Sequence, residues 1–295
     1  MSFAERVRQE LIAVVTKPNC CRRSLAEGLL AAANFDAESK CVLIRYNQEE
    51  GAGLAEEVLS HQFGKRPDVL KFGKCGHSYW DLSLNSPACK KFVRSMDAEE
   101  VSADDVLSFA CDGCSSAFLR GLFLACGTVN DPHKSFHMEF KLPAHRVPFV
   151  SDFLTSLGYP PRVISRNGIT GLYYKDGATI EDLITLMGAG QGLFEVINSR
   201  IERDIRNNEN RATNCVARNI EKTIAAATKQ MEAINRLMES GKLESLPESL
   251  KETARLRYAN PDASLDELVS LHLPIISRSG LNHRLKKIVD AADEL

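Results

Sequence analysis

The sequence lacks any run of about 18 apolar residues, the length that a membrane-spanning helix needs, so we expect no membrane association. Its first residues, Met1-Ser-Phe-Ala-Glu5, carry an early acid and no apolar core of a signal peptide. A strong charge of one sign is also missing, because 37 Lys and Arg against 39 Asp and Glu leave a net charge of −2. This balance excludes a wholly basic protein but not a local basic patch. We therefore expect a cytoplasmic protein.

Two common catalytic motifs are absent from the sequence. Gly188-Ala-Gly-Gln-Gly192 is rich in glycine but lacks the Gly-Lys-Ser/Thr end of a phosphate-binding loop, and it reads as a joint between helices. No serine-nucleophile elbow occurs. The 295 residues, 44% of them hydrophobic and 26% charged, are instead typical of two or three globular domains.

Cysteine is plentiful, but its pattern does not predict a disulfide framework. The nine cysteines are an odd number, and without an export signal we expect them to stay reduced. Cys111-Asp-Gly-Cys114 is a CxxC pair that could bind zinc only with two more ligands, and neither Cys20-Cys21 nor Cys75-Gly-His77 has zinc-finger spacing. We therefore favour structural thiols and expect neither metal nor cofactor.

What the chain does contain is an internal repeat. Four positions of the helical segment 21–33 recur 93 residues later: Cys21, Gly28, Leu29 and Ala32 match Cys114, Gly121, Leu122 and Ala125. A glycine costs about 1 kcal/mol inside a helix, so its presence in both copies suggests close helix–helix packing.

The segments that follow the two helices also match. Each copy continues with a strand, a helix, a strand pair and a helix, and a further strand after the first helix is compatible with the pattern. The expected strands are 40–46, 69–72 and 79–84, then 135–142, 162–165 and 171–175, and the expected helices are 52–62 and 86–95, then 144–157 and 177–187. We predict an α+β fold with a pseudo-twofold duplication over residues 1–195, with repeats of about 1–100 and 101–195.

Leu119-Arg-Gly-Leu-Phe-Leu-Ala-Cys-Gly127 resembles the LAGLIDADG motif of homing endonucleases, and residues 25–33 form a weaker second copy. Further segments resemble the WhiA family of bacterial DNA-binding regulators: the Cys20-Cys21 pair, residues 127–132, 261–268 and 277–285. The resemblance covers essentially the whole chain. It implies a degenerate endonuclease-like domain followed by a C-terminal helix-turn-helix.

We expect no nuclease activity from this chain. In active homing endonucleases each motif helix ends with an acidic residue that holds a divalent metal ion. Those positions are Ala33 and Cys126 here, and a thiol is a poor ligand for Mg²⁺. Asp36 and Asp131 lie nearby, and we interpret Asp131, between Asn130 and Pro132, as a turn residue.

The last fifty residues, within a predicted domain of 244–295, read as three helices. The first spans about 248–258, the second begins with the capping box Ser264-Leu-Asp-Glu267, and Pro274 ends it. The third starts at the N-cap Ser277 and runs to about Ala292. A short capped helix, a turn and a basic helix are typical of a helix-turn-helix.

The third helix carries the candidate DNA contacts, with four cations and no acid between residues 277 and 287. We expect Arg278 and Asn282 to read bases, and Arg284, Lys286 and Lys287 to bind phosphates. Polar neighbours complete the predicted interface: Ser277, Ser279 and His283.

Residues 196–243 form a predicted helical linker that is polar along most of its length. Its cations include Arg206, Arg211 and Arg218, which we treat as accessory DNA contacts. The Asn207-Asn-Glu-Asn210 run predicts a break in the helix, and Gly241 to Pro247 a second junction.

The leading hypothesis is a sequence-specific regulator of transcription that binds double-stranded promoter DNA and associates with the nucleoid. The resemblance implies roles in cell division, chromosome segregation or sporulation, and cooperation with an RNA polymerase sigma factor. Two alternatives stay open: an active or nicking endonuclease, and a regulator whose N-terminal domain senses a ligand.

Overall fold

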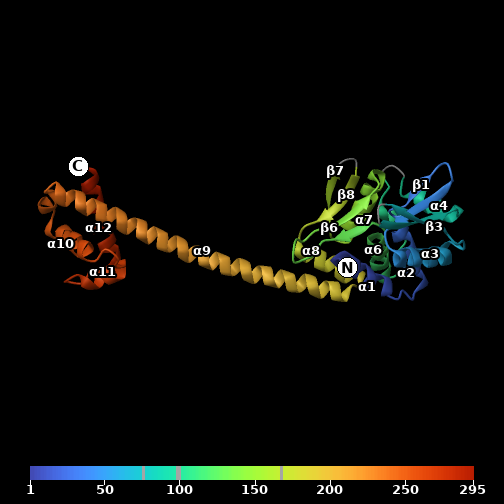
Figure 1. Cartoon of the computed structure of the whole chain (residues 1–295), viewed down its shortest axis with the longest axis horizontal. Coiled ribbons are helices and arrows are strands. Elements are labelled where there is room, and N and C mark those ends of the chain that lie inside the picture. The colour runs from blue at the N-terminus through green and yellow to red at the C-terminus, as the bar shows by residue number, and fades with distance from the viewer. Residues whose placement is uncertain (75–76, 98–100, 167–168) are drawn as a thin grey trace. The chain divides into compact units, whose positions relative to one another are not determined.

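The computed structural model describes residues 1–74, 77–97, 101–166 and 169–295 (Figure 1). Cys75, which the zinc argument considered, lies outside the described residues. The chain divides into two compact units, Met1–Arg203 and Asp204–Leu295. No helix within the described ranges has the length and apolar character needed to span a membrane.

The first unit contains two repeats of the same order of elements. The first repeat is α1 (Phe3–Ala13), α2 (Asn19–Leu30), β1 (Asn34–Asp36), β2 (Cys41–Tyr46), α3 (Glu49–Phe63), β3 (Asp68–Lys74), β4 (His77–Leu84) and α4 (Pro87–Ser95). The second is α5 (Ala103–Val106), α6 (Gly113–Cys126), β5 (Gly127–Val129), β6 (Met138–Leu142), η1 (Ala144–Arg146), α7 (Val147–Ser156), β7 (Arg162–Arg166), β8 (Ile169–Tyr174) and α8 (Gly177–Met187). The predicted duplication is confirmed, and the strands left open after the two motif helices are β1 and β5.

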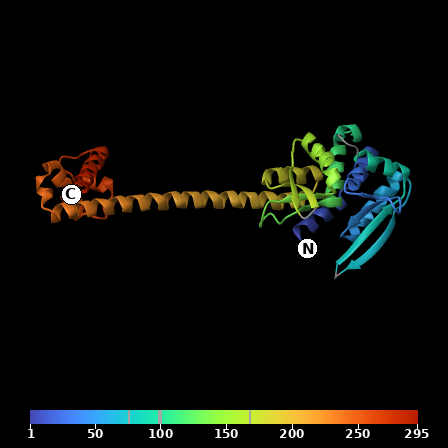
Figure 2. The ribbon, with the colours of Figure 1, turned by 90° about the horizontal axis from the view of Figure 1, so that it is seen from above.

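Each repeat folds its four strands into an antiparallel sheet, and the two sheets have the same topology. Their orders are β1-β2-β4-β3 and β5-β6-β8-β7, so the third strand of each repeat lies at one edge. Helices α2 and α6 pack against each other between the two halves (Figure 2). This pairing buries Leu29, Phe118 and Leu122 at the centre of one continuous core.

The two glycines of the repeat explain how α2 and α6 come so close. A Cβ atom on Gly28 would lie 2.1 Å from the carbonyl oxygen of Phe118, and one on Gly121 would lie 2.3 Å from that of Leu25. Both obstacles are backbone atoms, which cannot swing aside as a flexible side chain can. The close packing predicted from the paired glycines is therefore confirmed.

Helix α9 (Gly190–Glu239) follows α8 after Gly188, whose positive φ of 93° ends that helix. The predicted break at residues 207–210 is wrong, because α9 runs through them without interruption. Asparagine costs a helix less than about 0.7 kcal/mol per residue, so three of them among arginines and glutamates do not end it. The second junction is confirmed: Gly241 has a φ of 70° after the last turn of α9.

The second unit ends with η2 (Lys242–Ser245), α10 (Glu248–Ala259), α11 (Leu265–Leu271) and α12 (Arg278–Asp293), which match the three predicted helices. The capping box at Ser264 and Glu267 is present. Apolar side chains of α10, α11 and α12 share a core with the last turns of α9, including Ala233, Ile234 and Leu237. The C-terminal part of α9 is therefore part of this unit's core rather than a free spacer, and the predicted domain limits stay a prediction.

Candidate nucleic-acid interface

Helix α12 is amphipathic, and its packing decides which side chains face solvent. Ser277 caps it by accepting a hydrogen bond from the backbone N–H of Gly280 at 3.0 Å. Leu281, Leu285 and Ile288 point into the core and are at most 1% exposed. Their spacing of three and four residues leaves the opposite side of the helix to water.

Most of the predicted DNA contacts lie on that exposed side. Arg278, Asn282 and Lys286 are four residues apart and so follow one stripe of the helix. The exposed members of the predicted set are Ser277, Arg278, Ser279, Asn282, His283, Lys286 and Lys287. Six of these residues lie within positions 278–287 of α12, and Ser277 is its N-cap.

Arg278 forms an ion pair with Asp266 of α11, with 2.8 Å between Nη1 and Oδ2. Both side chains are about two-thirds exposed, at 66% and 68%. Exposed pairs of this kind contribute little stability, about 0–1 kcal/mol, so Arg278 can exchange Asp266 for a base or a phosphate at low cost. The pair holds the guanidinium at the junction between α11 and α12.

Arg284 differs from the other predicted contacts. Its side chain is only partly exposed, and its guanidinium donates a 3.4 Å hydrogen bond to the carbonyl oxygen of Ser249 on α10. Helical geometry explains this orientation, because Arg284 lies three residues after the buried Leu281 and one before the buried Leu285. The structure therefore places Arg284 at the edge of the exposed stripe, against the neighbouring helix.

The accessory arginines predicted in the linker, Arg206, Arg211 and Arg218, are all exposed on α9. The arginines just before them have partners within the first unit. Arg203 donates a 2.7 Å hydrogen bond to the carbonyl oxygen of Pro132, and Arg200 lies 2.7 Å from a carboxylate oxygen of Glu181. Only the later arginines of this stretch are candidates for DNA contact.

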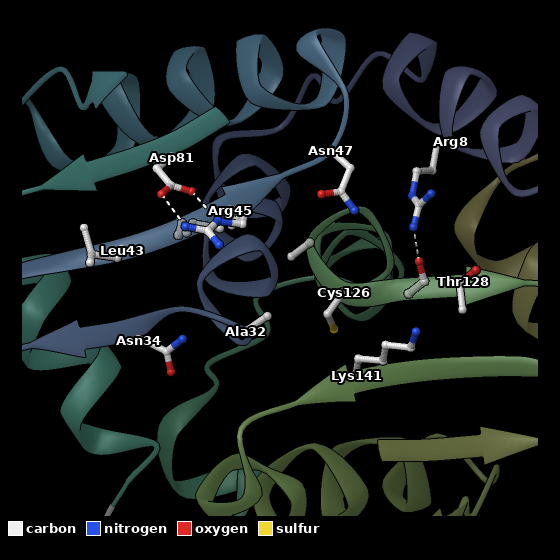
Figure 3. Close-up of a pocket in the computed structure, with 13 residues that line it drawn as sticks. Arg8, Ala32, Asn34, Leu43, Arg45, Asn47, Asp81, Cys126, Thr128 and Lys141 are labelled. Atoms are coloured by element: carbon white, nitrogen blue, oxygen red, sulfur yellow. Dashed lines mark hydrogen bonds and ion pairs between the residues drawn. The ribbon is translucent and has the colours of Figure 1, made fainter. Parts of the chain in front are cut away.

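The first unit has an open cleft of about 660 Å³ where α2 and α6 end (Figure 3). Strands β1 and β2 contribute to one side, and β5 and β6 to the other, so the cleft lies between the two repeats. Three cations line it: Arg8, Arg45 and Lys141. The only carboxylate among the lining residues, Asp81, forms two hydrogen bonds of 2.6 Å with the guanidinium of Arg45.

The positions that carry acids in homing endonucleases offer no carboxylate to this cleft. Ala33 is fully buried, and the neighbouring Ala32 lines the cleft in its place. Cys126 ends α6, and burial raises the pKa of its thiol far above the usual range, which keeps it neutral. A neutral thiol that lines the cleft is a poor ligand for Mg²⁺.

Asp36 and Asp131 stabilise turns, as predicted for Asp131. The Oδ1 atom of Asp131 accepts a 2.9 Å hydrogen bond from the backbone of His133. Asp36 accepts hydrogen bonds from the backbones of Glu38 and Ser39, at 3.2 and 3.0 Å. Neither aspartate lines the cleft.

Two features of the first unit were not found from the sequence. Arg8 comes from α1, which the repeat pattern did not include, and it donates a hydrogen bond to the carbonyl oxygen of Gly127 in the cleft. The second feature is a group of four cysteines, Cys20, Cys21, Cys111 and Cys114, that lie together although about 90 residues separate the two pairs. The repeat offset pairs Cys21 with Cys114, but zinc-finger spacing does not describe a cluster that is assembled by the packing of two helices.

Comparisons with known proteins agree with both units. The sequence model of the family "WhiA LAGLIDADG-like domain" matches residues 115–206. The sequence model of the family "WhiA C-terminal HTH domain" matches residues 210–292. Two relatives named "Probable cell division protein WhiA" are similar over 100% of this chain. They are 31% identical in Lachnoclostridium phytofermentans, covering 99% of that protein, and 30% identical in Caldicellulosiruptor saccharolyticus, covering 96%.

A solved structure shows the same fold. Full-length DUF199/WhiA from Thermatoga maritima is 22% identical, with a TM-score of 0.58 over 100% of this chain and 99% of that one. The helix-turn-helix and the LAGLIDADG-like duplication, both predicted from the sequence, are therefore confirmed. The chain belongs to the WhiA family.

Proposed function

We propose that this chain is a sequence-specific DNA-binding regulator of transcription that acts in cell division and does not cleave DNA. The observation that carries the proposal is the exposed face of α12, where Arg278, Asn282 and Lys286 lie along one stripe of a helix-turn-helix. Arginine and asparagine side chains can each form two hydrogen bonds with a base edge in the major groove. The names of the relatives, which are cell division proteins, support the process.

The place of each side chain along α12 decides whether we assign it to a base or to a phosphate. Arg278 and Asn282 lie in the first turns, where a recognition helix meets base edges, and we assign them the reading of sequence. Lys286 and Lys287 lie a turn further on and provide charge for the phosphate backbone, which contributes affinity without sequence information. Arg206, Arg211 and Arg218 on α9 are accessory phosphate contacts in this proposal.

Binding measurements on two kinds of duplex test the reading role. A duplex selected from a random library by the wild-type protein is compared with a scrambled one by fluorescence anisotropy at fixed salt. We expect Asn282→Ala and Arg278→Ala each to lose about 1–3 kcal/mol, or roughly 5- to 150-fold, on the selected duplex and little on the scrambled one.

The matched control for Arg278→Ala is Arg255→Ala. Arg255 is also an exposed arginine in an ion pair between two elements of the same unit, at 3.3 Å from Glu244. Its removal should leave binding to both duplexes unchanged. If Arg278→Ala and Asn282→Ala bind the selected duplex as the wild type does, α12 does not read the sequence.

The absence of nuclease activity is supported by Ala33 and Cys126, which stand where a metal-dependent nuclease of this fold needs carboxylates. We expect supercoiled plasmid to remain intact with Mg²⁺ or Mn²⁺ and a large excess of protein. Metal-dependent nicking that disappears in Asp131→Asn would contradict this part of the proposal. Metal-dependent nicking that persists in that variant after a second purification step would also contradict it, because Asp131 does not line the cleft.

The proposal extends to location and partner. A DNA-binding regulator is expected on the nucleoid, where a fluorescent fusion would place it. An RNA polymerase sigma factor is the proposed protein partner, and this extension rests on the family resemblance alone. Co-purification with the polymerase holoenzyme would test it.

A further inference from the structure

Four cysteine thiols gather at the beginning of the central helix pair. Cys20 and Cys21 lie in the first turn of α2, and Cys111 and Cys114 lie just before and just inside the start of α6. All four Sγ atoms lie within 4.8 Å of one another. The sulfur of Cys111 is 3.6 Å from that of Cys20, 3.4 Å from that of Cys21 and 3.6 Å from that of Cys114.

These separations match a four-coordinate metal ion better than a disulfide. Zinc binds thiolates at about 2.3 Å in a tetrahedron, which places the sulfur atoms about 3.8 Å apart. The sulfur atoms of a disulfide are about 2.05 Å apart, much closer than any pair here. The range from 3.4 to 4.8 Å brackets the tetrahedral value, so a zinc ion needs only small side-chain adjustments.

The surroundings also favour thiolates. Both pairs lie at helix N-termini, where the helix dipole stabilises negative charge.

The cluster has a defined place in the duplicated fold. Cys21 and Cys114 are equivalent positions of the two repeats, and each lies seven residues before its glycine, Gly28 or Gly121. The cluster is therefore at the N-terminal ends of α2 and α6, whereas the cleft with Cys126 is at the opposite ends. A metal ion bound there would join the two repeats directly.

We propose that Cys20, Cys21, Cys111 and Cys114 form a zinc site, with all four as thiolate ligands, that fastens the two repeats of the first unit together. All four positions are taken by protein, and no place is left for a bound water. The site is therefore structural rather than catalytic. This replaces the sequence-based expectation of structural thiols without a metal.

Metal analysis of the full-length protein tests the proposal. After purification with a chelator wash, we expect about one zinc per chain, as a closed four-ligand site binds. Cys111→Ser should lose nearly all of it, because serine is a poor zinc ligand and Cys111 touches the other three thiols. Cys215→Ser is the matched control, since Cys215 is an exposed cysteine on α9 outside the cluster, and it should retain the zinc.

A spectrum of the wild-type protein keeps the test independent of whether Cys111→Ser folds. After zinc is removed and replaced by Co²⁺, four thiolates in a tetrahedron give intense visible d–d bands and a sulfur-to-cobalt charge-transfer band. Wild type and Cys215→Ser should both show them. Any of three results would overturn the proposal: wild-type protein without zinc, zinc retained by Cys111→Ser, or the weak spectrum of octahedral cobalt.

Discussion

At the scale of single residues, His272 is a buried histidine that packs between α11 and α10 in the second unit. The residue ends α11, and its side chain is 1% exposed. Its Nε2 atom lies 3.5 Å from the hydroxyl of Thr253, and its Nδ1 atom lies 3.9 Å from a carboxylate oxygen of Glu252. Burial lowers the pKa of His272; the facing Glu252 on α10 opposes this shift, and Arg284 on α12 adds to it.

The lowered pKa predicts that the second unit loses stability in mild acid. The unfolded chain takes up a proton near pH 6.5, whereas the folded chain resists it, so the contribution of His272 is complete above that pH and falls as the pH drops below it. We expect the urea midpoint of this unit to fall between pH 7.5 and 5.5, and to fall less in His272→Gln.

The control for this prediction is His283→Gln, which changes an exposed histidine of α12. Its urea midpoint should depend on pH as that of the wild type does. An equal pH dependence in His272→Gln and in the wild type would show that burial of His272 does not affect the stability of the helix-turn-helix.

At the scale of elements, the crossing of α2 and α6 holds the first unit together. Gly28 and Gly121 bring the two backbones into contact, and the buried side chains around them form the centre of the core. Overpacking a site of this kind usually costs about 1–3 kcal/mol, and more where only backbone surrounds it.

Gly28→Ala should therefore lower the free energy of unfolding of the first unit by at least about 2 kcal/mol in urea titrations. Gly53→Ala is the matched control. Gly53 is exposed on α3 and has no atom within 4 Å of an added Cβ, so alanine should stabilise that helix by up to about 1 kcal/mol. Equal effects of the two substitutions would contradict the role given to the crossing.

The ends of helices were predicted well where hydrogen bonds between residues close in sequence determine them. The capping box of Ser264 and Glu267 and the N-cap Ser277 both act through neighbours within a few residues. Helix α9 shows the limit of this reasoning. The three asparagines near position 207 weaken a helix only slightly, and their flanking residues favour it enough to continue.

At the scale of the whole molecule, the duplication was visible because equivalent residues recur at a fixed offset. Residues that meet in space without sharing this offset leave no such trace. The cleft gains Arg8 from α1, and in the cysteine cluster Cys20 and Cys111 join Cys21 and Cys114, the pair that does recur at the offset. The exposure of the candidate DNA contacts on α12 was predictable because they share one amphipathic helix, except for Arg284, whose side chain turns toward α10.

The central claim is that α12 binds DNA, and the salt dependence of binding tests it most directly. Each phosphate contact contributes a slope of about −0.9 to the plot of log K against log salt. Replacing both Lys286 and Lys287 with alanine should therefore make the slope shallower by about 1.8. The adjacent lysines Lys90 and Lys91 on α4 provide the matched double control, which should leave the slope unchanged.

The measurement is a titration of one labelled duplex with full-length wild type and both double variants at four or more salt concentrations. A shallower slope for the α12 variant alone is the result that we predict. A slope equal to that of the wild type would contradict the claim that this face meets the phosphate backbone. A change in the α4 variant instead would move the DNA-binding surface to the first unit.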